Sequence, residues 1–161
     1  MLPLPSYDRQ FITLFRFGSG YVRRHVAVNI NAADYKDLET IAIEKAMLGM
    51  RVDMMPTLQD DDPLRSVIFP DAIGFKCPDL RINGTLWEVE KSFNSQKLNN
   101  LKHAVDEGSK QAHHVIILLS HNVEYSFLYR VAKGRFKDHE NLLVIEFRYG
   151  GSYTIFKKEK Q

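Results

Sequence analysis

A short stretch near the middle of the chain predicts a β-hairpin that carries acidic side chains. Asn83-Gly84 stands between Asp79 and the run Leu86–Lys91, and Asn-Gly is the strongest short-range signal for a type I′ hairpin turn. The run reads as a strand, and alternate side chains of a strand lie on one face, so Glu88 and Glu90 project together. The turn folds Asp79 back beside Glu88. The sequence therefore predicts three carboxylates on one sheet face, an arrangement that holds a divalent cation.

The segments before this hairpin predict a second hairpin, a helix and a short strand. Residues 11–30 contain an aromatic run, a Gly-Ser-Gly turn and an alternating apolar pattern, which together indicate a hairpin. Asp34 is placed to begin a helix with apolar residues at helical spacing, and Gly49 is placed to end it. Residues 52–55 read as a strand, and the acidic stretch 60–63 reads as a surface loop.

The segments after the hairpin alternate between helical and strand patterns. Apolar residues between Leu98 and Ala112 mark one helix face, and the continuous apolar run within 114–120 is typical of a strand covered on both faces. A second helix is predicted over 123–137, followed by strands over 142–147 and 153–156. A helix between two strands indicates a crossover connection, which makes the sheet mixed. We therefore expect an α/β or α+β fold with a central mixed β-sheet flanked by helices.

Composition adds modest bounds. A chain of 161 residues, with 44% hydrophobic and 26% charged residues, is typical of one soluble domain over residues 1–161. The net charge of +2 neither requires nor excludes a polyanionic partner. Cys77 stands alone and cannot form an intramolecular disulfide, which favours a reducing, cytoplasmic location. The start of the chain has prolines and no basic segment followed by an apolar run, so we expect no signal peptide and no membrane span, and Met1 favours a complete start.

The element order around the hairpin resembles the core of the PD-(D/E)XK nuclease superfamily, which has a restriction-endonuclease-like fold. The matching motif is Pro78-Asp79 followed by Glu88-Val89-Glu90. The resemblance covers about residues 34–120, and it makes the N-terminal hairpin 11–30 and the C-terminal strands 141–156 additions to the core.

A longer run within the same region is similar to nuclease domains of contact-dependent inhibition toxins, other polymorphic bacterial toxins and phage-associated proteins. It extends from Gly49 through Lys76–Lys91 to the helix that ends in Lys110-Gln111-Ala112. The resemblance implies a divalent-metal-dependent endonuclease of DNA or RNA, tRNA included. A toxin or mobile-element setting, and an immunity protein or other regulatory partner, follow from the same resemblance.

The predicted site suits Mg²⁺ or Mn²⁺, because hydrolysis of a phosphodiester needs an activated water and neutralised phosphate charge. Asp79 and Glu88 are the expected metal ligands, with the Val89 carbonyl as a third. The family pattern has lysine where this chain has Glu90, which we expect to ligate a second ion or to orient the water. Lys91 falls one residue later, on the opposite strand face unless a bulge turns it towards the metal.

Basic residues elsewhere are candidates for substrate contact. Lys110 and Gln111, at the end of the following helix, are placed to touch the scissile phosphate. Arg23 and Arg24 are candidates for a basic rim that binds nucleic acid. The other members of that rim would be His25, Lys133, Arg135 and Lys137.

Two alternatives to a metal-dependent nuclease remain open at this point. A metal-independent ribonuclease would use His25, His103 or His121 as acid and base and would cut in EDTA. A catalytically inactive module would keep the nuclease-like sheet for binding nucleic acid or protein, and the glutamate at position 90 favours this reading. Homodimerisation through the apolar hairpin 11–30 is a further hypothesis.

Overall fold

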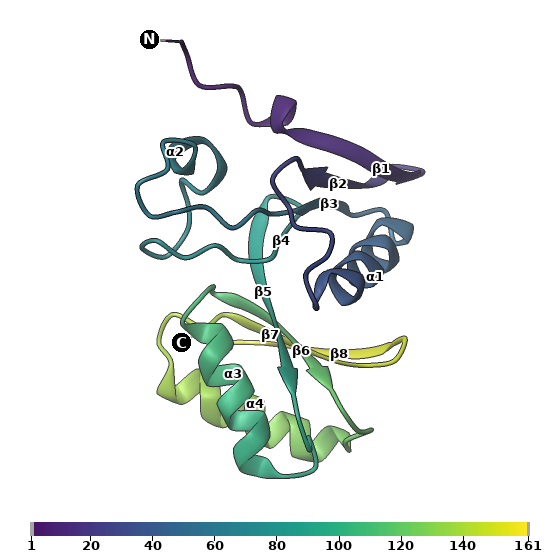
Figure 1. The fold of residues 1–161 in the computed structure, drawn as a ribbon. Coiled ribbons are helices and arrows are strands. Elements are labelled where there is room, and N and C mark those ends of the chain that lie inside the picture. The colour runs from purple at the N-terminus through teal and green to yellow at the C-terminus, as the bar shows by residue number, and fades with distance from the viewer. Residues whose placement is uncertain (1, 161) are drawn as a thin grey trace. The chain divides into compact units, whose positions relative to one another are not determined.

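The computed structural model describes residues 2–160, and its eight strands form mixed β-sheet structure, with parallel and antiparallel pairs in each of two compact parts of the chain (Figure 1). This confirms the predicted fold class. The strands are β1 (Phe11–Phe17), β2 (Gly20–His25), β3 (Arg51–Met54), β4 (Leu80–Ile82), β5 (Thr85–Ser92), β6 (His114–Leu119), β7 (Val144–Tyr149) and β8 (Ser152–Lys157). The helices are α1 (Tyr35–Met47), α2 (Arg65–Ile68), α3 (Leu98–Ser109) and α4 (Tyr125–Asp138), and a 3₁₀ turn, η1, spans Asp8–Gln10.

The chain divides into two compact units within β5. Unit 1 extends to Leu86, and unit 2 begins at Trp87. The single domain expected over residues 1–161 stays a prediction. None of the helices in the described residues is long and apolar enough to cross a membrane.

Unit 1 is built on β1 to β4 with α1 packed against β2 and β3. The β1–β2 hairpin is antiparallel as predicted, β2 and β3 are parallel, and β3 and β4 are antiparallel. Gly20 begins β2 where the end of α1 comes close: a Cβ at this position would lie 1.9 Å from the carbonyl oxygen of Ala46. Only glycine permits this approach, so the Gly-Ser-Gly segment is both a turn and a packing site.

The N-terminal hairpin is shorter than the alternating pattern indicates. We expected a strand through Ile30, but β2 ends at His25, and Val26 and Ile30 are exposed. The reason is the loss of partners: the β1 pairing ends where Phe11 faces His25, and the β3 pairing ends at Arg24. A strand without a partner leaves its backbone groups unpaired, so the alternation beyond His25 does not extend the sheet.

The predicted turn between β4 and β5 is present. Asn83 and Gly84 have φ angles of 48° and 86°, as a type I′ turn requires. Asn83 also fastens the turn to β3, because its Oδ1 accepts the Arg51 N–H at 2.9 Å and its own N–H donates to the Arg51 carbonyl at 2.8 Å.

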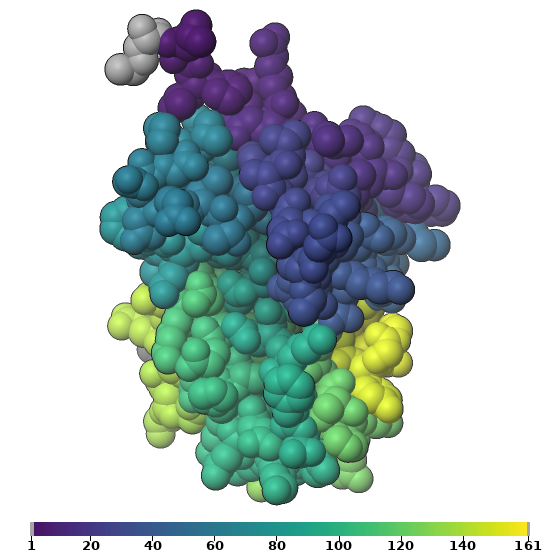
Figure 2. All heavy atoms as spheres, viewed as in Figure 1, coloured from purple at the N-terminus to yellow at the C-terminus, as the bar shows by residue number. Residues whose placement is uncertain are grey.

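In unit 2, α3 and α4 pack on the same face of the sheet (Figure 1). Strands β5, β6 and β7 are parallel, and β8 is antiparallel to β7. Val115, Ile116 and Ile117 of β6 are all fully buried, which confirms a strand covered on both faces. The teal-green segment that contains α3 forms much of the near surface of this unit in Figure 2.

Candidate functional site

Glu88 and Glu90 lie on the face of β5 that α3 covers. Glu88 is opposite Val115 and Glu90 is opposite Ile117 in the parallel pairing with β6, and both of these β6 residues belong to the apolar core with α3 and α4. Neighbouring residues of parallel strands share a face, so the two glutamates point to that side. Glu88 is only 8% exposed. A carboxylate this buried is a functional-site candidate, since burial of charge is costly unless it is compensated.

Helix α3 can lie close to Glu90 because the residue of α3 that faces it, Gly108, has no side chain. A Cβ placed on Gly108 would lie 2.5 Å from Cγ1 of Val115 and 3.4 Å from Cγ of Glu90. The missing side chain therefore lets the end of α3 approach the sheet beside the second glutamate. The spacing of the two acidic residues is set by the strand, and the space around Glu90 is set by this glycine.

Lys91 lies on the opposite face of β5 from Glu90. The pairing of β5 with β6 is regular from Trp87 to Ser92, and Lys91 is opposite Leu118. The pairing therefore contains no bulge that would turn Lys91 towards the glutamates. Val89 shares the face of Lys91 by the same alternation. Trp87, on the same face as Val89 and Lys91, is half-buried with its ring 5.1 Å from that of His114.

Asp79 lies in unit 1, directly before β4, and its carbonyl accepts the Met55 N–H at 3.0 Å. Across residues 2–160, no group of three or more His, Cys, Asp or Glu side chains is arranged to hold a metal ion. The three-carboxylate site therefore stays a prediction. The two-carboxylate part of it, Glu88 with Glu90, shares one strand face.

Lys110 and Gln111 lie at the end of α3, as expected. The Lys110 Nζ is 2.8 Å from Oε1 of Glu107, and both side chains are largely exposed. This hydrogen bond, together with the opposite charge, raises the pKa of Lys110 and lowers that of Glu107. Gln111 donates its backbone N–H to the Gly108 carbonyl at 2.9 Å. Both residues remain candidates for phosphate contact.

The two arginines of the expected basic rim in unit 1 make contacts within the fold. Arg23 donates two hydrogen bonds, of 2.7 and 2.9 Å, to the carboxylate of Asp53 and a third, of 2.9 Å, to Asp8. Arg24 donates to the hydroxyl of Tyr35 at 2.8 Å. Two parallel bonds to one carboxylate are the strongest form of such a pair, so Arg23 stabilises the strand packing.

The three histidines of the alternative mechanism differ in exposure. His25 is 1% exposed, and its ring is held between the Gln10 side chain at 2.9 Å and the Ala27 N–H at 3.0 Å. Burial lowers the pKa of His25, which favours the neutral ring. His103 and His121 are exposed, so within this set they are the ones with access to a substrate.

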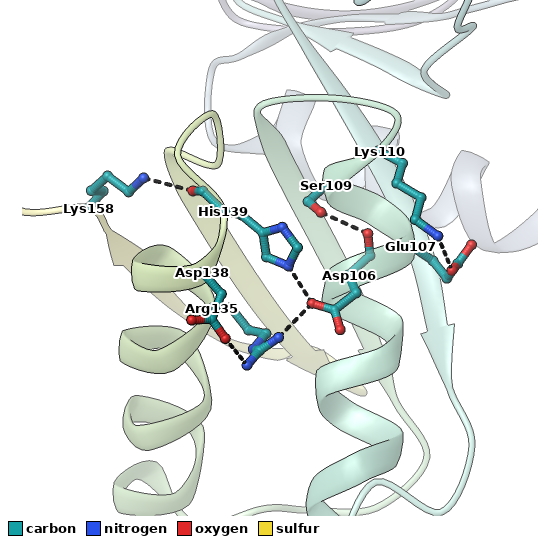
Figure 3. A network of polar contacts seen from close by, with 8 residues as sticks. All are labelled: Asp106, Glu107, Ser109, Lys110, Arg135, Asp138, His139 and Lys158. Carbon is teal, nitrogen blue, oxygen red and sulfur yellow. Dashed lines mark hydrogen bonds and ion pairs between the residues drawn. The ribbon is translucent and has the colours of Figure 1, made fainter.

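A network of charged residues joins α3 and α4, and the sequence patterns did not predict it (Figure 3). Oδ1 of Asp106 accepts a hydrogen bond from Arg135 at 2.9 Å and another from His139. Arg135 also donates to Asp138 at 2.6 Å, so this member of the expected basic rim is engaged. Burial on its own would raise the pKa of Asp106, but the Arg135 and His139 bonds hold that pKa below its usual value.

A cavity of about 650 Å³ lies in unit 2 where α4 meets the end of β8. Its lining contains five lysines, two glutamates and three aromatic residues. They are Lys133, Lys137, Lys157, Lys158, Lys160, Glu140, Glu159, Tyr129, Phe136 and Phe156, with Ala132 beneath them. We call this the lysine–aromatic pocket. Lys133 and Lys137 were expected in a basic rim; the lysines after residue 156 were not.

The chain matches no protein-family model and no curated protein. Among solved structures, the CdiA-CT/CdiI toxin and immunity complex from Burkholderia pseudomallei is similar to it, with a TM-score of 0.48 and 15% sequence identity. The match covers 83% of this chain and 91% of that chain. A likeness at this level does not assign an activity.

Proposed function

We propose that the chain is a divalent-metal-dependent nuclease that hydrolyses phosphodiester bonds of DNA or RNA. The observation that supports this most is the pair Glu88 and Glu90 on one face of β5, with Glu88 largely buried. The resemblance of the motif at Pro78-Asp79 and Glu88-Val89-Glu90 supports the same reading. A toxin or mobile-element setting with an immunity partner is part of this proposal.

The chemistry of the two glutamates fits the proposed ion. Mg²⁺ prefers oxygen ligands and is usually held by one or two carboxylates, with waters and substrate phosphates completing the octahedron. Glu88 and Glu90 supply that number without a third acidic side chain. The predicted turn at Asn83-Gly84 supports Asp79 as an additional ligand, and the Val89 carbonyl is the other candidate. When bound, the ion would lower the pKa of a water and offset charge on the phosphate.

The residues around the ion take distinct roles in this proposal. Glu88 binds the metal, and Glu90 orients the attacking water or a second ion. Lys91 is less suited to that task, because its side chain leaves β5 on the opposite face. Lys110 and Gln111 would contact the scissile phosphate from the end of α3.

Cleavage of plasmid DNA, single-stranded DNA and total tRNA with Mg²⁺, Mn²⁺ or EDTA tests the proposal. We expect cutting that requires the metal and falls at least 100-fold in Glu88→Gln, which keeps the shape but removes the charge. Glu124→Gln is the matched control, since Glu124 is an exposed residue that makes no side-chain hydrogen bond as the N-cap of α4.

Two results would reject this function. Cutting that persists in EDTA would move the chemistry to exposed histidines such as His103 and His121. Binding without cutting at any metal concentration would favour the inactive binding module. Circular dichroism of Glu88→Gln must match the parent protein, so that lost cutting reports chemistry and not folding.

A further inference from the structure

We propose that the lysine–aromatic pocket of unit 2 binds single-stranded nucleic acid. This inference deepens the proposed function and rests on it, because it names the form of the substrate and a surface that holds it. The pocket is distinct from the glutamates of β5 and involves α4, β8 and the residues that follow β8.

The charge of the pocket suits a polyanion. Five lysines line it against two glutamates. One of them, Lys158, is held in place by a hydrogen bond of 2.8 Å to the carbonyl of His139 (Figure 3) and by another of 2.8 Å to the carbonyl of Glu140. Lys133, Lys137, Lys157 and Lys160 are exposed. Ammonium groups gathered this closely favour phosphate, because each contact releases condensed counterions from the nucleic acid.

Two aromatic residues of the pocket, Tyr129 and Phe156, and the adjoining Tyr125 supply surfaces on which unpaired bases stack. Tyr125 and Tyr129 lie one turn apart on α4 with nearly parallel rings, 18° between planes and 6.4 Å between centroids. They are 63% and 46% exposed. Phe156 supports them from β8, with its ring 5.4 Å from Tyr125 and 6.1 Å from Tyr129. Exposed rings beside cations are the usual features of single-strand binding sites, and stacking tolerates any base.

The order of these residues along α4 gives the site a direction. Tyr125, Tyr129, Lys133 and Lys137 recur every fourth residue, so they form a row along one side of the helix with steps of about 6 Å. The row begins with two rings and continues with two ammonium groups. A duplex hides its base faces and would use only the lysines, whereas a single strand offers both bases and phosphates to such a row.

Fluorescence anisotropy with a labelled 12-nucleotide single strand, as DNA and as RNA, tests this site in EDTA, where the proposed cleavage is off. We expect the parent protein to bind the single strand at least tenfold more tightly than the same sequence as a duplex. The double variants Tyr125→Ala/Tyr129→Ala and Lys133→Gln/Lys137→Gln should each lose at least tenfold in affinity. Tyr149→Ala, an exposed tyrosine of β7, and Lys36→Gln/Lys97→Gln are the controls and should change affinity less than twofold.

Equal affinity for duplex and single strand, or double variants that bind like the parent protein, would overturn the proposal. Tighter binding of a labelled polyglutamate peptide than of the single strand would overturn it too, in favour of an acidic protein partner. Glu88→Gln separates the two proposals: it should bind the single strand normally. If Glu88→Gln still cuts, the nuclease site is wrong while the binding site stands. If Glu88→Gln loses cutting and the pocket variants bind like the parent protein, the binding site is wrong while the nuclease site stands.

Discussion

At the scale of single residues, Asp106 is the point where α3 and α4 are fastened by charge. Its pKa is lowered in the folded protein, so the carboxylate stabilises the fold above its unfolded pKa of about 3.9 and loses that effect as pH falls through the lower folded value. We expect Asp106→Asn to reduce the free energy of unfolding at pH 7 by about 1–2 kcal/mol. The difference from the parent protein should shrink below about pH 4. Urea unfolding at a series of pH values measures both.

Asp138 provides the control for this prediction. It bonds the same arginine, but its side chain is 55% exposed and lies three residues away on the helix itself. Asp138→Asn should therefore change stability by less than about 0.5 kcal/mol. If Asp106→Asn unfolds at the same urea concentration as the parent protein at pH 7, apolar packing alone holds the two helices together.

At the scale of elements, two helical glycines should respond in opposite directions to alanine. Gly108→Ala places a Cβ 2.5 Å from Val115 Cγ1, so either α3 or the buried Val115 side chain must shift, and we expect a loss of about 1–3 kcal/mol in stability. Gly134 of α4 has nothing within 4 Å of an added Cβ. Gly134→Ala should therefore stabilise by about 0.5–1 kcal/mol through helix propensity alone. Thermal unfolding of both variants compares them directly.

A stable Gly108→Ala protein would show that the α3–β6 contact adapts. The same variant bears on the proposed site, because the added Cβ also approaches Glu90 Cγ at 3.4 Å. We expect its cleavage to fall more than its stability explains, whereas Gly134→Ala should cut like the parent protein.

Helices, strands and turns follow closely from the local sequence pattern where the neighbouring elements needed to pair or pack with them are also present. The apolar run of β6, the α1 spacing up to Gly49 and the Asn83-Gly84 turn all appear as predicted. The strand past His25 does not, because pairing ends with the neighbouring strands and no local pattern encodes where a neighbour ends. The short helix α2 was not predicted either, since four residues carry too little periodicity.

The site residues divide in the same way, into those set by one local segment and those that depend on segments distant in the sequence. The alternation of Glu88 and Glu90 is readable because it depends on a single strand. The Asp106–Arg135 bond joins residues 29 apart on different helices, and the lysine–aromatic pocket joins α4 to residues that follow β8. The four-residue spacing of Tyr129, Lys133 and Lys137 along α4 was the available local signal for that pocket. Its partners become visible only once the helix and the strand are packed.

At the scale of the whole molecule, a net charge of +2 is too small to attract nucleic acid from all sides. Binding must therefore come from local clusters of basic residues. The salt dependence of the affinity then reports how many phosphates these residues neutralise. For single strands, log K falls with log salt by about 0.7 per neutralised phosphate. We expect a slope of log K against log salt of about −3 if the four exposed lysines of the pocket each meet a phosphate. In Lys133→Gln/Lys137→Gln the slope should be shallower by about 1.4.

Titration of the single strand at several KCl concentrations measures these slopes, with Lys36→Gln/Lys97→Gln as the control. An unchanged slope in the pocket variant would show that its lysines do not meet phosphates. A shallower slope in the control as well would indicate diffuse attraction by surface lysines in general.

The chain-order arrangement of strands also has a consequence for how the protein folds. Each pairing given for unit 1 joins strands that follow one another in the chain, and the same holds for unit 2. Contacts between segments close in sequence close small loops, and chains rich in such contacts fold fast. During synthesis, the preceding strand would already be present when each new strand emerges, so the two could pair at once. The apolar β6 would therefore spend little time exposed to other nascent chains.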